Sequence, residues 1–130
     1  MKTFTIHGEN FSDISGFYGE VDRVFMQGET WMLGESLDAF DDLLYGGFGA
    51  LAGEKEIRLV WRGFEKSKVD LGLQATKDFY LQKLRQPQVY NADWARQKLA
   101  GLEAGTGKTY FEMLLEIIAQ HPNVRFFPEP

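Results

Sequence analysis

Cysteine is absent from this chain of 130 residues. Its absence excludes disulfide bonds, thiol catalysis and thiolate metal sites, and it favours a reducing, cytoplasmic location. Histidine and proline are scarce, with two and four residues. No apolar run approaches the roughly 18–20 residues that a membrane-spanning helix needs, and Met1 to Ile6 read as a strand without the apolar core of a signal peptide. We therefore expect a cytoplasmic protein with no membrane partner, no metal and no cofactor.

An excess of positive charge is also missing, which makes direct binding of nucleic acid a poor prediction. The formal net charge is −5, but it is unevenly distributed. Residues 1–56 hold eleven acidic and three basic residues, whereas residues 57–130 hold eight acidic and eleven basic residues. Five of the acids lie within fourteen positions: Glu29, Glu35, Asp38, Asp41 and Asp42. Such a block is either a solvated face or the electrostatic footprint of a basic partner.

Length and composition predict one globular domain over residues 1–130. Apolar periodicity predicts strands near 3–7, 56–61 and 124–127, and helices near 14–25, 37–44, 64–69 and 109–118. Strands separated by helices predict an α/β fold with a small parallel sheet. Residues 74–108 contain two weakly amphipathic segments, which we interpret as a helical insertion because so short a segment makes a poor independent core.

Local sequence also predicts where individual helices begin. Ser36 and Asn91 are suited to cap the helices that follow them, and Ser12 or Asp13 is suited to cap the first helix. Thr109 begins a capping box, in which a threonine and a glutamate three residues later bond each other's backbone.

The run Gly105-Thr106-Gly107-Lys108-Thr109 is similar to the end of a phosphate-binding loop. That motif needs a glycine at position 102, where Leu102 stands, and a strand before it, where the pattern predicts a helix. We therefore interpret the run as a glycine-rich turn into a capped helix and predict no nucleotide cofactor.

Asp38, Asp41 and Asp42 have the i, i+3, i+4 spacing that can place them on one helical face. Paired carboxylates serve acid–base catalysis or Mg²⁺ binding, so a small hydrolase using Asp38 and Asp42 is one alternative. His7 and His121 have no ligand-like spacing, and no nucleophile–base pair accompanies the acids. We therefore predict that the chain is not an enzyme.

Trp31-Met32-Leu33 precede this acidic helix in a glycine-flanked loop. They either cover the core or supply the aromatic anchor that protein interfaces favour beside a charged patch. Gly46-Gly47-Phe48-Gly49 follows the helix and could form a mobile rim.

Four segments, taken in order and spacing, resemble the barstar family of intracellular ribonuclease inhibitors. They are Ile6–Glu9 with Ile14-Ser15, Gly34–Leu44, Leu59–Lys68, and Phe111–Phe127. The resemblance covers about 1–70 and 109–127, and residues 74–108 have no counterpart in the short family members. It implies a three-stranded parallel sheet flanked by helices. It also implies an acidic helix and preceding loop that plug the active site of a basic ribonuclease, with carboxylates in the place of substrate phosphates.

Carried over residue by residue, the resemblance implies that Asp42 is the central acid, with Asp38 one turn earlier and Glu116 on the penultimate helix. The predicted partner-binding residues are Trp31, Met32, Gly34, Glu35, Asp38, Asp41, Asp42, Gly46 and Glu116. Three positions depart from the family pattern, since Met32 and Gly47 replace aromatic residues and Asp41 replaces a tryptophan. These departures indicate a cognate enzyme other than barnase. The alternative prediction is a protein-interaction module with the same fold and a non-nuclease partner.

Overall fold

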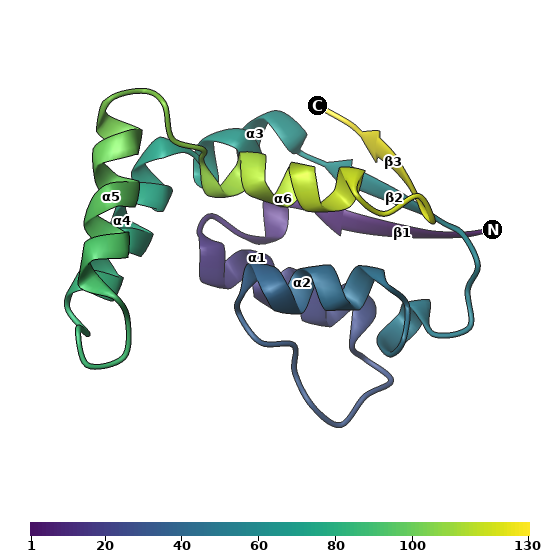
Figure 1. Cartoon of the computed structure of the whole chain (residues 1–130). Coiled ribbons are helices and arrows are strands. Elements are labelled where there is room, and N and C mark those ends of the chain that lie inside the picture. Colours follow the sequence, from purple (N-terminus) through teal and green to yellow (C-terminus); the bar gives the residue numbers. More distant parts are fainter.

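The backbone is built around a parallel sheet of three strands, which we describe from a computed structural model of residues 1–130 (Figure 1). The strands are β1 (Lys2–His7), β2 (Ile57–Arg62) and β3 (Val124–Pro128), in the spatial order β1-β2-β3. The central strand β2 pairs in parallel with both neighbours, with Leu59 opposite Phe4 on one side and Phe126 on the other. The predicted α/β fold with a three-stranded parallel sheet is confirmed.

Six α-helices connect and follow the strands. They are α1 (Ile14–Phe25), α2 (Leu37–Leu44), α3 (Phe64–Asp70), α4 (Leu73–Leu84), α5 (Ala92–Glu103) and α6 (Tyr110–Ala119), with short 3-10 turns η1 (Gly8–Asn10) and η2 (Gly49–Leu51). The two weakly amphipathic segments form α4 and α5, which pack on each other as a hairpin at one end of the molecule (Figure 1). None of these helices combines the length and apolar character needed to cross a bilayer.

The predicted caps begin four of these helices. The side chain of Ser36 accepts a hydrogen bond from the Ala39 amide, and that of Asn91 accepts one from the Trp94 amide. Thr109 forms both hydrogen bonds of its capping box. Asp13, one of the two candidates for the first helix, caps α1. These predicted helix starts are confirmed. They could be predicted because a cap is a local interaction between a side chain and the first amides of the helix, which have no helical carbonyl as a partner.

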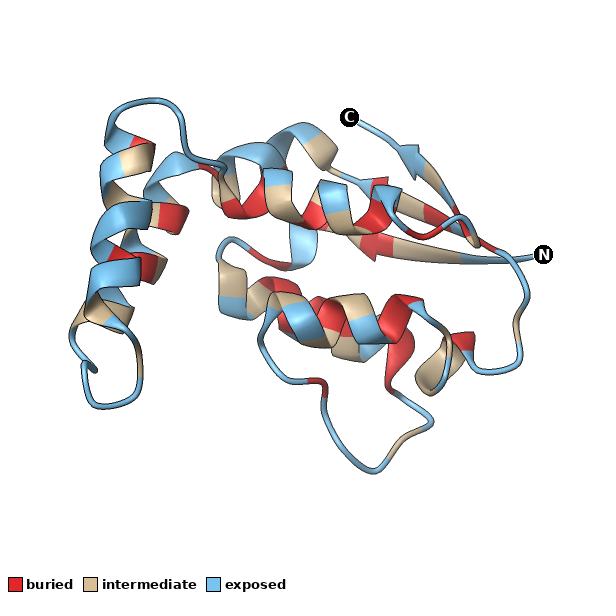
Figure 2. Ribbon diagram, in the orientation of Figure 1, coloured by how far each residue is buried: buried red, intermediate tan, exposed pale blue.

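The core lies between one face of the sheet and the helices α1 and α6, and helix α2 packs against α6 and against Phe17 of α1 (Figure 2). Along β2 the side chains alternate, with Ile57, Leu59 and Trp61 buried and Arg58 and Arg62 exposed. Trp61 is completely buried, and its indole nitrogen donates to Ser67 Oγ at 3.0 Å. This bond satisfies the polar atom of the largest core side chain and ties β2 to α3.

One charged side chain, Glu20 of α1, is buried in this arrangement. Its carboxylate accepts from the His7 amide at 2.8 Å, from Asn10 Nδ2 at 3.0 Å, and from two nitrogens of Arg23 at 2.7 and 2.8 Å. Burial raises the pKa of Glu20, but these hydrogen bonds outweigh it and hold the pKa below its ordinary value. The ionised carboxylate therefore joins the end of β1 to α1.

Candidate partner-binding site

Helix α2 presents an apolar side to the core and an acidic side to solvent. Phe40, Leu43 and Leu44 are buried, whereas Asp38 and Asp42 are exposed. Neither of these two carboxylates belongs to any of the chain's ion pairs. Like charges at i, i+4 weaken a helix slightly. Helix α2 therefore carries uncompensated negative charge, and its packing on the core offsets the cost to helix stability.

Asp41 points to a different environment from Asp38 and Asp42. Its Oδ1 lies 2.6 Å from Nε2 of His121, a buried residue between α6 and β3. The His121 ring also packs edge-on against Tyr45, with 4.6 Å between ring centroids. Asn123 adds a second link, because its Nδ2 donates to the Leu44 carbonyl at 2.9 Å. Asp41 therefore anchors α2 to the turn before β3.

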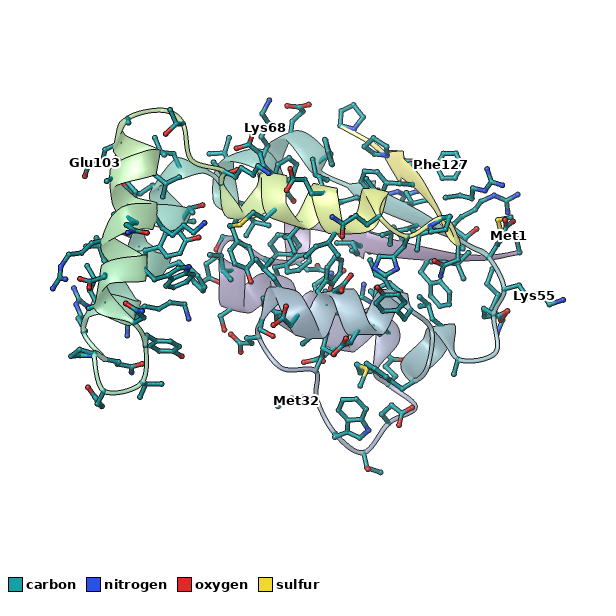
Figure 3. The ribbon with its side chains drawn as sticks, in the orientation of Figure 1. Met1, Met32, Lys55, Lys68, Glu103 and Phe127 are labelled. Atoms are coloured by element: carbon teal, nitrogen blue, oxygen red, sulfur yellow. The ribbon has the colours of Figure 1, made fainter.

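The loop between α1 and α2 is held at its base and exposed at its tip. Leu33 is buried, and its amide donates to Asp22 at 2.9 Å. At the tip, Trp31 is 46% exposed and Met32 is 77% exposed, and Figure 3 marks Met32 on the loop that runs below α2. The Trp31 ring rests against Phe48, with 5.0 Å between centroids. Of the three residues, Leu33 covers the core, whereas Trp31 and Met32 present apolar surface to solvent.

Three further predicted residues lie at the two ends of α2. Gly34 and Glu35 precede the Ser36 cap; both are exposed, and Glu35 has no ion pair within the chain. Gly46 follows the helix with φ of +85°, a backbone conformation that side-chain-bearing residues rarely adopt. A glycine at this place lets the chain leave α2 sharply.

Glu116 is exposed on α6, which packs beside α2 (Figure 1). Its carboxylate is already paired, because Oε1 lies 2.6 Å from Nζ of Lys108. Eight of the nine predicted residues lie in one loop–helix segment, 31–46, and within it Asp41 alone forms an ion pair, with His121. The ninth, Glu116 on α6, is paired with Lys108. Sequence analysis missed both of these partners, His121 and Lys108.

The glycine-rich turn between α5 and α6 does not have the geometry of a phosphate-binding loop. The amides of Thr106 and Gly107 both donate to the Gly101 carbonyl at 2.9 Å, and a helix, not a strand, precedes the turn. Two of the amides that would cradle a phosphate are therefore used within the chain. No group of three or more histidine, aspartate or glutamate side chains is arranged to hold a metal ion.

A comparison with protein families finds one match, a family described as Barstar (barnase inhibitor), over residues 1–98. This range runs from β1 into α5 and stops before α6 and β3. No curated protein matches the chain. Because the match continues beyond residue 74, it does not separate α4 from the family's domain, and the insertion over 74–108 stays a prediction.

Proposed function

The chain belongs to the barstar family, and on that premise we propose that it is an intracellular, immunity-type inhibitor of a basic ribonuclease. The observation that carries the proposal is the pair of exposed carboxylates on α2, Asp38 and Asp42, neither of which has a cation within the chain. Trp31 and Met32 lie exposed on the loop immediately before this helix. Together they form an acidic face beside an apolar anchor, the composition of a protein-binding surface.

The mechanism follows from what a ribonuclease active site must bind. Such a site holds the phosphates of RNA with cationic side chains, so a rigid helix that presents carboxylates there competes directly with the substrate. Opposite potentials on inhibitor and enzyme also accelerate their association and make it sensitive to salt. The inhibitor needs no catalytic group, which agrees with a family of inhibitors and not of enzymes.

Within this proposal the nine predicted residues have different tasks. Asp42 is the central acid, Asp38 lies one turn earlier, and Glu35 extends the negative surface beyond the helix. Asp41 is a positioning residue, because His121 already binds its carboxylate. The remaining contacts are the apolar anchors and the helix-end glycines, with Glu116 joining when Lys108 releases it: Trp31, Met32, Gly34, Gly46 and Glu116.

A titration of nuclease activity tests the proposal. The intact chain is added to a panel of small basic ribonucleases, including barnase, at low and high salt. We expect stoichiometric inhibition of at least one enzyme, weakened by salt. Asp42→Ala should weaken it by about 30-fold or more, because truncating one side of a buried charge pair costs about 2–5 kcal/mol, a range derived largely from the barnase–barstar complex.

The matched control is Glu103→Ala, which removes one negative charge from the exposed end of α5. A panel without any inhibition would contradict the proposal, as would equal losses from Asp42→Ala and Glu103→Ala. Capture of a stably bound protein that is not a nuclease, together with a silent panel, would assign the fold to a non-nuclease interaction module instead.

A further inference from the structure

A hollow of about 750 Å³ lies between the N-terminal end of α1 and the helix α4. Its walls include Ser12 to Ser15 at the start of α1, Val69 and Asp70 at the end of α3, and one side of α4. Glu35, in the loop before α2, also lines it. This α1–α4 hollow therefore adjoins the proposed partner-binding surface, although no residue of α2 itself lines it.

Carboxylates dominate the charge of the α1–α4 hollow. Four of them line it: Asp13, Glu35, Asp70 and Asp78. Asp70 is neutralised by Lys66, whose Nζ lies 2.6 Å from its Oδ2. No other carboxylate of the four has a cationic partner within the chain.

Two of the three remaining carboxylates accept hydrogen bonds, and both bonds come from neutral groups. Asp13 accepts from the Gly16 amide at 2.7 Å, and Asp78 accepts from Nε2 of Gln74 at 3.0 Å. Glu35 is exposed and its carboxylate accepts no hydrogen bond within the chain. Neutral donors leave the carboxylate charge in place, so the hollow has a net negative potential.

The hollow also contains two aromatic rings, and its one basic residue, Lys83, already lies over them. Nζ of Lys83 lies 4.6 Å from the Phe79 ring centroid and 3.8 Å from that of Tyr90, and all three residues line the hollow. Contacts of this kind stabilise a cation through the negative face of the ring. Lys83 is the one basic residue in the lining, and it already covers both rings. The three carboxylates without an ion pair outnumber it, so the acidic walls attract more positive charge than the chain supplies.

We propose that the α1–α4 hollow binds an arginine side chain from a loop of the partner protein, beside the surface presented by α2. A planar guanidinium forms paired, charge-assisted hydrogen bonds with carboxylates, so it suits the acidic walls of the hollow. That the arginine comes from a basic ribonuclease rests on the function proposed above. In this arrangement α4 forms a second part of the interface, and the partner contacts both α4 and α2.

The test uses the full chain and a probe that does not depend on the nuclease. Amide and indole NMR signals of the ¹⁵N-labelled chain are followed during titration with the peptide acetyl-Gly-Arg-Gly-amide at low ionic strength. The matched probe carries citrulline, which has the shape of arginine without its charge. We expect saturable shifts at residues of the hollow, including the amides of Glu35 and Asp78, and binding about tenfold weaker for the citrulline peptide.

Asp78→Asn is the informative variant, because Asp78 lines the hollow and lies outside the predicted partner-binding residues. It should weaken binding of the arginine peptide by about two- to fivefold, whereas Glu103→Gln, outside the hollow, should leave it unchanged. Equal shifts with both peptides, shifts elsewhere, or no effect of Asp78→Asn would overturn the proposal. Broadening of the hollow's signals with protein concentration alone would overturn it too, by assigning the hollow to a second copy of the chain.

The two proposals fail separately. A silent ribonuclease panel with arginine bound in the hollow would refute the proposed target and retain the hollow as a cationic side-chain site. Nuclease inhibition that depends on Asp42, with no arginine-specific shifts in the hollow, would refute the arginine site in the hollow and leave the proposed inhibitor function standing.

Discussion

Two neighbouring aspartates of α2 are predicted to respond in opposite ways to the same substitution. Asp41→Ala removes the carboxylate that binds buried His121 at 2.6 Å, whereas Asp42→Ala removes an exposed carboxylate with no internal partner. Both changes replace aspartate by alanine within one helix, so the gain in helix propensity is nearly the same for each. The difference between the two variants therefore isolates the contact with His121.

The size of that difference follows from the geometry of the contact. The His121 side chain is 3% exposed and the Asp41 side chain 33% exposed. A hydrogen bond to a charged group contributes about 1.5–3 kcal/mol, and leaving a buried polar atom unpaired costs about 1–3 kcal/mol. Because Asp41 is partly solvated, we expect about 2 kcal/mol less free energy of unfolding for Asp41→Ala. Asp42→Ala should be neutral or stabilising by up to about 0.5 kcal/mol, since it relieves repulsion with Asp38.

Urea unfolding followed by tryptophan fluorescence measures both variants, and a double-mutant cycle with His121→Ala gives the coupling directly. We expect a coupling energy of about 1–2 kcal/mol between Asp41 and His121. Ribonuclease inhibition should rank the variants in the reverse order, with Asp42→Ala more impaired. Equal stability of the two aspartate variants, or a coupling energy near zero, would refute the assignment of Asp41 as a positioning residue.

Three other substitutions probe separate parts of the structure. Glu20→Gln should lower the free energy of unfolding by about 2–4 kcal/mol at neutral pH. Because the folded-state pKa of Glu20 is lowered, the stabilisation by its carboxylate is present above the ordinary pKa of 4.5 and is lost as the pH falls through the folded-state pKa. A difference in urea unfolding that does not change with pH would contradict this assignment. Gly49→Ala should cost about 1–3 kcal/mol, since φ is +68° and a Cβ would lie 2.8 Å from a carbonyl oxygen of α1. The control Gly19→Ala, in open space on α1, should instead stabilise the chain by about 0.5–1 kcal/mol in the same assay. Lys108→Ala should change the free energy of unfolding by less than about 0.5 kcal/mol. Because it frees the Glu116 carboxylate, it should also speed association with a basic ribonuclease, as measured by stopped-flow mixing. An unchanged or slower association rate would argue against a role for Glu116.

Much of the fold follows from local patterns in the sequence. Helix starts at Ser36, Asn91 and Thr109 were predictable because a cap bonds amides only two or three residues away. The strand ending near Trp61 was predictable because most of its residues are β-branched, aromatic or large and apolar. The exposed acids of α2 followed from helical spacing, which places Asp38 and Asp42 on the side opposite Phe40.

The internal partners of the candidate site did not follow from the sequence. Asp41 and His121 are 80 positions apart and meet only because the turn after α6 lies against the end of α2. Lys108 and Glu116 are eight positions apart, across a turn and most of a helix, which is not a spacing that helical periodicity selects. Glu20 resembles any solvent-facing glutamate of an amphipathic helix until η1 folds over it. Tertiary packing decides each of these contacts.

The order of strands in the sheet has a consequence for how the chain reaches its folded state. Both strand pairs are parallel, and parallel strands need long crossover connections. About fifty residues separate β1 from β2, and about sixty separate β2 from β3. Such distant pairings make folding slow compared with that of helical bundles. Until β3 is in place, one edge of the central strand offers unpaired amides and carbonyls to other chains. During synthesis, the half-built sheet is therefore the stage most open to aggregation.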